Sequence, residues 1–325
     1  MSTDITSAAP PQRGRRRRFS QLSKSDKLWL SLMVGVPTIL HILFVWVPAI
    51  ATIVLSLTKW DGIKLGSWSG VGFKNYWTIF TVLEGKLLPS LFNNVILLVF
   101  LAFCSTIGML LAYLLDKGVR GSSIYQSVFY FPVVLSLAVV GFIWKGVMFS
   151  QSQGLLNLGR DKPIDFVGNA EKLFTFRIPG IDVDLGLSKN FAALLIAIAW
   201  RHVGYVMVLY LSGLKSVDPS LREAAAIDGC NEWQSFRRVV FPVMKPINVV
   251  VLVITVIEAL RAFDIIVALK EPVGTSVMGV LVRKNLVGEG GGNVGLGSAY
   301  GVVLLLLCVG FIIWYLINNF REQES

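Results

Sequence analysis

Three charged side chains recur at helical spacing inside one apolar run. Glu258, Arg261 and Asp264 stand three residues apart in a stretch otherwise rich in Val, Ile and Leu. Positions i, i+3 and i+6 lie near one face of a helix, so these side chains are expected to form a polar stripe. Arg201 and His202 lie in a second apolar run. Charged groups are costly inside a membrane and therefore mark either a solute pathway or ion pairs between helices.

Both interpretations of the stripe remain open from the residues alone. Glu258 and Arg261 are spaced for an i, i+3 ion pair within their own helix. They could equally pair with a neighbouring helix or with a second subunit. A solute pathway or a gate is the functional alternative.

The remaining residues offer little for catalysis or metal binding. Three cysteines and two histidines are too few and too scattered for a disulfide framework or a His-based metal cluster. The sequence contains no G-x-x-x-x-G-K-[ST] motif, so any ATP chemistry must reside on another chain. Residues 288–297, "GEGGGNVGLG", lack the strand, helix and Lys context of a phosphate-binding loop and predict a flexible loop. We therefore expect no catalytic residues, no metal and no cofactor on this chain.

The elements that must position these charges are membrane-spanning helices. Hydrophobic residues make up 54% of the 325 residues and charged residues only 15%, too little charge to cover a soluble surface. Apolar runs of about twenty residues, the length that crosses roughly 30 Å of hydrocarbon, recur along the chain. The pattern predicts an all-α membrane protein with six spans, in the ranges 28–57, 90–115, 124–149, 191–214, 246–269 and 296–320.

The distribution of charge predicts the orientation of the chain. The formal net charge is +10, and a cluster of Arg and Lys in residues 13–27 precedes the first apolar run. By the positive-inside rule this places the N-terminus in the cytoplasm, and an even number of spans returns the C-terminus there. We expect a disordered basic tail over 1–27, a spanning domain over 28–320 and a short cytoplasmic tail over 321–325. Residues 150–190, whose charges cancel, are expected to form a small folded cap outside the membrane.

One long inside loop carries a pattern of helix caps. Asp218 is a natural N-cap and Pro219 suits the first helical position, while Gly229 can end the helix in the left-handed conformation. Asn231 and Gln234 then form the capping box of a second helix, whose inner face would hold Trp233, Phe236 and Val240. The loop, residues 216–243, is therefore predicted to be a helix, a turn and a helix. Such a helix suits either the cleft of a partner protein or the surface of the bilayer.

The same loop carries a recognisable signature. Residues 223–242 read E-A-A, three residues, G, nine residues, V, one residue, F-P. This resembles the EAA signature of permease subunits in binding-protein-dependent ABC importers, with Val239 in place of Ile and Phe241 in place of Leu. Further stretches resemble the maltose-type, carbohydrate-uptake branch in the expected order: "WDG" at 60–62, "GFKNY" at 72–76, "FYFPVV" at 129–134, "GLLN" at 154–157 and "AFDII" at 262–266.

The resemblance implies a fold and a set of partners. The fold would be the type I permease of ABC importers, with cytoplasmic coupling helices that dock on the ATPase. The partners would be a second homologous permease, a dimer of ATPase subunits that bind ATP and Mg²⁺, and an extracytoplasmic sugar-binding protein or lipoprotein. The protein would be located in the bacterial cytoplasmic membrane, and nucleic acid would not be a partner. The implied coupling surface consists of Glu223, Ala224, Ala225, Asp228 and Gly229.

The implied function is to form half of the pathway for a sugar or an oligosaccharide. Because sugars are held by hydrogen bonds and by aromatic stacking, Tyr205 and Asn94 join Glu258, Arg261 and Asp264 as candidate pathway residues. Aromatic residues in spans also act as packing or interfacial anchors. A non-sugar solute such as glycerol phosphate is the alternative substrate class. An ion-driven carrier is a more distant alternative, and the chain shows no inverted repeat of broken helices to favour it.

Overall fold

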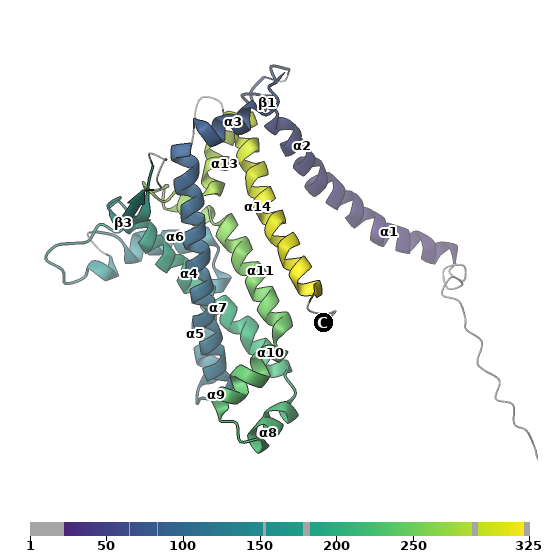
Figure 1. Cartoon of the computed structure of the whole chain (residues 1–325), viewed down its shortest axis with the longest axis vertical. Helices are drawn as coiled ribbons and strands as arrows, with labels where there is room; N and C mark the ends of the chain where they lie inside the picture. The colour runs from purple at the N-terminus through teal and green to yellow at the C-terminus, as the bar shows by residue number, and fades with distance from the viewer. Residues whose placement is uncertain are drawn as a thin grey trace, which may run out of the picture. The chain divides into compact units, whose positions relative to one another are not determined.

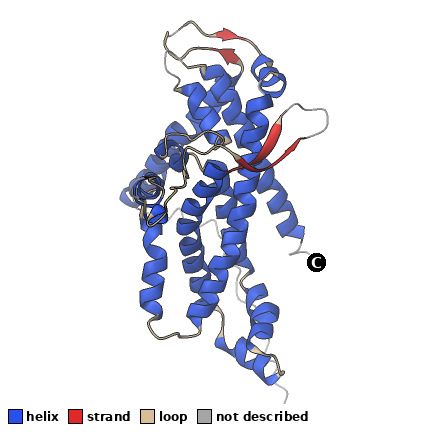
Figure 2. Cartoon of the chain, turned by 90° about the vertical axis from the view of Figure 1, so that its left-hand side faces the viewer, coloured by secondary structure: helices blue, strands red, loops and turns tan. Residues whose placement is uncertain are grey.

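The computed structural model describes residues 23–64, 66–82, 84–151, 154–177, 183–287 and 292–321. Most of the predicted basic tail, part of the glycine-rich loop and the last four residues lie outside these ranges. Two compact units are distinguished, Met1–Thr52 and Ile53–Ser325. Figure 1 labels their elements and Figure 2 separates helices from strands.

The first unit contains most of one long apolar helix. It consists of α1 (Lys24–His41), the π-helical turn η2 (Ile42–Trp46) and α2 (Val47–Ser56), which run without interruption into the second unit. Ser23 and Asp26 form a capping box at its start. The helix therefore begins four residues before the predicted span, because the cap lies at Ser23 rather than at the first apolar residue. No residue of α1 or η2 is buried within this chain.

Four long helices run along the second unit. They are α4 (Glu84–Asp116), α7 (Lys189–Ser216), α11 (Lys245–Arg261) and α14 (Val294–Arg321), and the first three pack together. The shorter elements are α3 (Lys74–Thr81), α5 (Ser122–Val134), α6 (Leu137–Ile143), η3 (Trp144–Met148), η4 (Leu155–Asn157), α12 (Asp264–Ala268) and α13 (Met278–Leu286). Among the described residues, Lys24–Ser56, Gly85–Asp116, Lys189–Ser216 and Val294–Ile313 are each long and apolar enough to cross a membrane. They correspond to the first, second, fourth and sixth predicted spans.

The third predicted span is bent rather than straight. Its two parts, Ser122–Val134 and Leu137–Met148, meet at an angle of 103°. Leu135 is extended, and the Ser136 hydroxyl accepts a hydrogen bond from the Val139 amide to start α6. Pro132 lies just before the bend. The apolar run thus contains its own helix stop and restart, which hydropathy alone does not reveal.

The fifth predicted span is also interrupted. Helix α11 has 17 residues, about 26 Å at 1.5 Å per residue, and ends at Arg261. Ala262 then makes a tight turn, in which the Phe263 amide donates to the Arg261 carbonyl at 2.7 Å. Burial favours the break, because Ile265, Ile266 and Leu269 of the redirected segment are packed in the core. The expectation of one continuous helix over 246–269 is therefore wrong.

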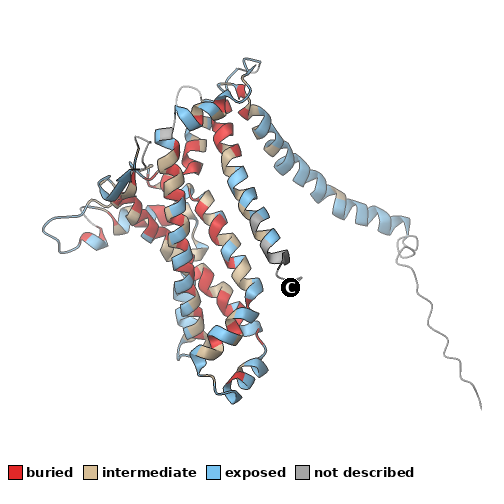
Figure 3. Ribbon diagram, viewed as in Figure 1, coloured by how far each residue is buried: buried red, intermediate tan, exposed pale blue. Residues whose placement is uncertain are grey.

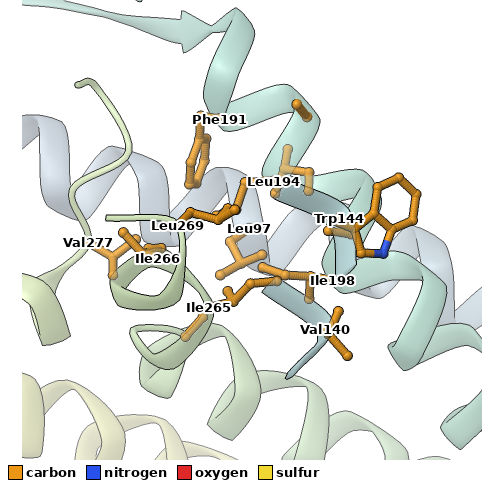
Figure 4. Packing of buried hydrophobic residues seen from close by; sticks show 14 of the residues in the cluster. Leu97, Val140, Trp144, Phe191, Leu194, Ile198, Ile265, Ile266, Leu269 and Val277 are labelled. Carbon is orange, nitrogen blue, oxygen red and sulfur yellow. The ribbon is translucent and has the colours of Figure 1, made fainter. Parts of the chain in front are cut away.

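The largest core cluster lies where α4, α6, α7 and α12 meet. Figure 4 shows Leu97, Leu194, Ile198 and Ile265 converging between these helices, with Trp144 at one side. Figure 3 shows that buried positions follow the inward faces of α4, α7 and α11, whereas the outward faces are exposed and apolar. Exposed apolar faces of this extent are expected where lipid or another subunit covers a membrane helix.

The two ends of the second unit are built differently. One end carries the hairpin of β1 (Thr58–Lys59) and β2 (Ser69–Gly70), and the opposite end carries a helical loop (Figures 1 and 2). A second hairpin, β3 (Lys172–Arg177) with β4 (Asp184–Ser188), and η4 give the segment 150–190 local structure. The helical loop consists of α8 (Pro219–Ile227), α9 (Glu232–Ser235), η5 (Phe236–Val240) and α10 (Phe241–Val243).

A loop near the hairpin end is held by side chains of the long helices. It connects α12 to α13, and Lys270 and Glu271 begin it in the left-handed conformation. Asn93 of α4 donates to the carbonyls of Gly274 and Ser276 at 3.0 and 2.8 Å. Thr275, Val277 and Met278 are completely buried. This connection is therefore fixed as firmly as a core element.

Candidate functional site

The loop at the helical end folds as its capping residues predict. The Asp218 carboxylate accepts a hydrogen bond from the Ser220 amide at 2.9 Å, and Pro219 occupies the first turn of α8. This bond lowers the pKa of Asp218 below its usual value, so the charged cap is present at neutral pH and is lost only as the pH falls through the folded-state pKa. Gly229 ends the helix with φ of +80°, and the next amide, of Cys230, returns to the Ala225 carbonyl at 3.0 Å.

Four of the five predicted coupling residues lie on the exposed side of this helix. Glu223, Ala224, Asp228 and Gly229 are exposed, whereas Ala225 is only 4% exposed. The small side chain at Ala225 therefore serves packing within the loop rather than a contact surface. Ile227, the last residue of α8, is 87% exposed, and the sequence analysis did not single it out.

The second half of the loop supports the first. Asn231 and Gln234 form the predicted capping box, and Phe236 and Val240 are buried. Trp233 stacks on Phe236 with ring centroids 5.5 Å apart. The predicted inner face is confirmed for Phe236 and Val240, whereas Trp233 is 49% exposed and covers Phe236 from outside. Arg237 and Arg238 are exposed.

Ion pairs connect this loop to the end of α4. Arg222 of α8 donates to the Asp116 carboxylate at 2.8 Å, and Lys117 pairs with Glu232. The hydrogen bond that the Lys117 ammonium donates to the Glu232 carboxylate raises the pKa of Lys117. A cavity of about 220 Å³ lies between the loop and α4, lined on the α4 side by Tyr113, Asp116 and Lys117. These pairs join residues more than one hundred positions apart, so no sequence spacing could have indicated them.

A polar cluster occupies the middle of the helical body. Arg201 Nη1 lies 2.7 Å from Glu258 Oε1, and His202 Nδ1 lies 2.5 Å from Glu258 Oε2. On its other side, His202 Nε2 lies 2.9 Å from the Ser105 hydroxyl, which lies 3.1 Å from the hydroxyl of Thr255. His202 is fully buried, whereas the side chains of Arg201 and Glu258 are 23% and 22% exposed. The cluster thus joins α4, α7 and α11 and presents one ion pair at its edge.

The predicted stripe is not formed as expected. Glu258 pairs with Arg201 and His202 of α7 rather than with Arg261 of its own helix. Asp264 lies beyond the break at Ala262, at the start of α12, and Arg261 and Asp264 are exposed. Of the alternatives left open by the sequence, pairing with a neighbouring helix is the one formed, because α7 places Arg201 and His202 close to Glu258.

The other two candidate pathway residues differ in their surroundings. Tyr205 is partly buried on α7, one turn after Arg201 and on the same face. Asn94 is buried, its amide nitrogen donating to the Ala259 carbonyl at 2.7 Å and its oxygen accepting from the Met278 amide at 2.9 Å. The Asn94 side chain thus holds α4, α11 and α13 together.

The sequence analysis did not identify Ser105 and Thr255 as members of the polar cluster. The only available signal was that each is a hydroxyl residue inside an apolar run, and such residues also bond their own helix backbone, as both do here. In the described part of the chain, no three His, Cys, Asp or Glu side chains are grouped to hold a metal ion.

The sequence and the fold were compared with known protein families, curated proteins and solved structures. The profile of the family described as "Binding-protein-dependent transport system inner membrane component" matches residues 14–323. The xylose/arabinose import permease protein XacH of Haloferax volcanii is 28% identical, covering 98% of this chain and 96% of that protein. The osmoprotective compounds uptake permease protein GgtC of Synechocystis is 32% identical over 86% and 94%. A solved bacterial ABC transporter involved in the import of alginate matches with a TM-score of 0.71 and 22% identity, covering 92% of this chain and 96% of that one.

Proposed function

Because the chain belongs to the family of binding-protein-dependent transport system inner membrane components, we propose that it passes a sugar or an oligosaccharide through the membrane. It is a multi-pass permease subunit of an ABC importer and has the type I permease fold. One observation carries the mechanism: α8, capped by Asp218 and ended by Gly229, is presented at one end of the helical body. A short stiff helix in that position can receive a push from a partner.

The exposed face of α8 is the proposed coupling surface. Glu223, Ala224, Ile227 and Asp228 offer two carboxylates and two apolar groups along about two turns, and Gly229 closes the helix. Such a face fits a groove on an ATPase subunit. The buried Ala225 lets α8 lie close to the rest of the loop. ATP and Mg²⁺ would be bound by two partner ATPase subunits, and their closure would move the loop and open the pore to the other side.

The edge of the polar cluster is the proposed contribution to the pathway. Partly exposed charges within spanning helices are tolerated where they meet water or another protein. Arg201 and Glu258 satisfy that condition together, and Tyr205 lies on the same face as Arg201. Arg261 and Asp264, exposed at the break between α11 and α12, would lie further along the same route. A second homologous permease would supply the other half of the passage.

Charge at this edge favours a neutral solute over an anion. The guanidinium of Arg201 is paired with the Glu258 carboxylate, so the couple offers donors and acceptors without an excess positive charge. Hydroxyl groups of a sugar match such a pair, whereas a phosphate would have to compete with the carboxylate for Arg201. The relatives named for xylose/arabinose and for osmoprotective compounds support a small polar solute. Glycerol phosphate remains the alternative that transport measurements must exclude.

The proposed orientation places the loop of α8 in the cytoplasm, beside the ATPases. Lys215, Arg237, Arg238 and Lys245 flank or lie within it, as the positive-inside rule requires. The hairpin β3–β4 would then face the extracytoplasmic side, where a separate binding protein would deliver the solute. Both termini would be cytoplasmic.

Reconstitution of the complete importer tests the proposal. The tagged chain is purified with its co-expressed partners, and the accompanying subunits are identified by mass spectrometry. Uptake into ATP-loaded proteoliposomes is then measured for a labelled monosaccharide, a disaccharide, an oligosaccharide and glycerol 3-phosphate. We expect sugar uptake that vanadate abolishes and an uncoupler leaves intact.

Two outcomes would overturn parts of the proposal. Uptake of glycerol 3-phosphate without uptake of any sugar would reject the substrate class. Uptake stopped by an uncoupler but resistant to vanadate would reject the ATPase partners in favour of an ion-driven carrier.

A further inference from the structure

Arg222 connects three elements of the chain. From α8 it donates through Nη1 to the Asp116 carboxylate at the last residue of α4, at 2.8 Å. Through Nη2 it donates to the carbonyl of Leu214, in the last turn of α7, at 3.2 Å. These are the only side-chain hydrogen bonds that α8, described in full, makes to either long helix. Asp116 is only 14% exposed, so the pair is shielded at the α4 side.

The surroundings of the pair make it the direct link between α8 and α4. The cavity of about 220 Å³ separates the loop from the end of α4, and Arg222 and Asp116 both line it. Helix α8 packs mainly on α9 and η5. A force applied to α8 therefore reaches α4 directly through the Arg222 side chain, and indirectly through α7, which precedes α8 by two residues, or through the second half of the loop.

Helix α4 also contacts the polar cluster around His202 and the segments next to the break at Ala262. Eleven residues before Asp116, Ser105 contacts His202 of the polar cluster. Further along, Asn94 bonds the Ala259 carbonyl of α11, and Asn93 bonds the loop between α12 and α13. A displacement of the Asp116 end of α4 is thus transmitted by hydrogen bonds to the segments around the break at Ala262.

We propose that the Arg222–Asp116 pair is the brace that transmits movement of α8 to α4 and that Arg222 acts by positioning rather than by touching the ATPase. The inference rests on the proposed coupling function of α8. It differs from that function in assigning the transmission to two residues outside the exposed coupling surface. An ion pair suits this task, because it holds its geometry with one contact across a hollow region where packing atoms are absent.

A charge-reversal series in the reconstituted importer tests the brace. Arg222→Asp and Asp116→Arg are measured singly and together for assembly, ATP hydrolysis and solute uptake. Each single reversal is expected to lower uptake per ATP hydrolysed by about tenfold, within the range of ordinary coupling energies. The double variant restores opposite charges and is expected to recover most of that loss.

Glu232→Gln is the matched control. Glu232 pairs with Lys117 beside the same cavity, but its side chain is 78% exposed. A solvent-exposed pair contributes little, so uptake per ATP is expected to stay within about twofold of the unaltered importer.

Neutral variants cover the case in which the reversed charges prevent assembly. Arg222→Gln and Asp116→Asn are combined in a double-mutant cycle on the same ratio. If the residues act as one brace, the double variant is no worse than the poorer single variant.

Three results would overturn the brace: normal coupling in Arg222→Asp, failure of the charge swap to rescue an assembled importer, or strictly additive losses in the neutral cycle. The second result would mean that Arg222 acts through a contact other than Asp116, such as the Leu214 carbonyl or the ATPase. Absence of ATP-driven uptake in the unaltered importer would instead reject the proposed function, so the two failures are distinguishable.

Discussion

Gly229 holds a backbone conformation that most side chains resist. Its φ of +80° ends α8, and a Cβ at this position would meet no atom within 4 Å. The strain of a substitution is therefore conformational rather than steric within this chain. Asn tolerates the left-handed region, whereas a β-branched residue does not.

Two substitutions at this position separate backbone strain from surface contact. Gly229→Val is expected to lower ATP-driven uptake by about tenfold or more, because it distorts the end of the coupling helix. Gly229→Asn is expected to keep uptake within about threefold, because Asn enters the left-handed region at modest cost. Uptake and membrane content are measured together in proteoliposomes. Equal loss in both variants would show that a partner requires the bare glycine surface.

Glu258 is the shared partner of two groups in the polar cluster. Glu258→Gln removes the carboxylate charge and leaves the partly buried guanidinium of Arg201 without its partner, which destabilises the folded chain. The importer carrying this variant is expected to melt at a lower temperature than the unaltered one. Replacing both Glu258 and Arg201 with Leu should restore much of the lost stability, because neither residue of this ion pair then leaves an unpaired charge.

Arg261→Gln is the control for this prediction. Arg261 belongs to the same helix but is exposed, and a change there is expected to alter the free energy of unfolding by less than about 0.5 kcal/mol. Equal destabilisation by the Glu258 and Arg261 variants would contradict the assignment of Glu258 to the cluster.

The sequence predicted some of the roles of single residues but not their partners. The sequence identified Glu258 as unusual because a carboxylate in an apolar run stands out, and it identified the caps of α8 because capping is local. The partners of Glu258 could not be found, since Arg201 and His202 lie more than fifty residues away and meet it only through helix packing.

Close approach of two helices depends on Gly204. A Cβ on this residue of α7 would lie 1.9 Å from the Phe129 carbonyl of α5. Small residues let membrane helices pack at short distance, and here the neighbour is rigid backbone. Gly204→Ala is therefore expected to push α5 from α7 and to lower the melting temperature of the importer.

Gly310→Ala provides the comparison within α14. A Cβ at Gly310 meets no atom within 4 Å, and alanine raises helix propensity. The melting temperature should be unchanged or slightly higher. If Gly204→Ala behaves in the same way, the close packing of α5 on α7 is refuted.

Breaks within apolar runs mark the limit of sequence interpretation at the scale of elements. Hydropathy located the helices α1–α2, α4, α7 and α14, because each is long and uniformly apolar. It did not reveal the bend at Leu135 or the turn at Ala262. Those interruptions are decided by burial of the following residues in the core, which depends on partners distant in sequence.

The proposed orientation of the whole chain can be tested with single cysteines. Asp228 and Lys162 are exposed and lie in the α8 loop and in the segment 150–190. In a Cys230→Ser background, a membrane-impermeant maleimide should label Asp228→Cys only in inside-out vesicles and Lys162→Cys only in right-side-out vesicles. Cys104 is buried in α4 and Cys308 is partly buried in α14, so the variant without added cysteines measures the background labelling. The reverse labelling pattern would reject the orientation.

The firmly held connection between α12 and α13 has a consequence for hydrogen–deuterium exchange. Loops usually exchange their amide protons early, but the amide of Met278, where this connection enters α13, is buried and donates to Asn94. Its peptide should exchange on the timescale of the long helices, far more slowly than the exposed turn around Lys162. In Asn94→Ala the same peptide should become labelled early. The junction between this connection and α13 would then be among the last parts of the molecule to open.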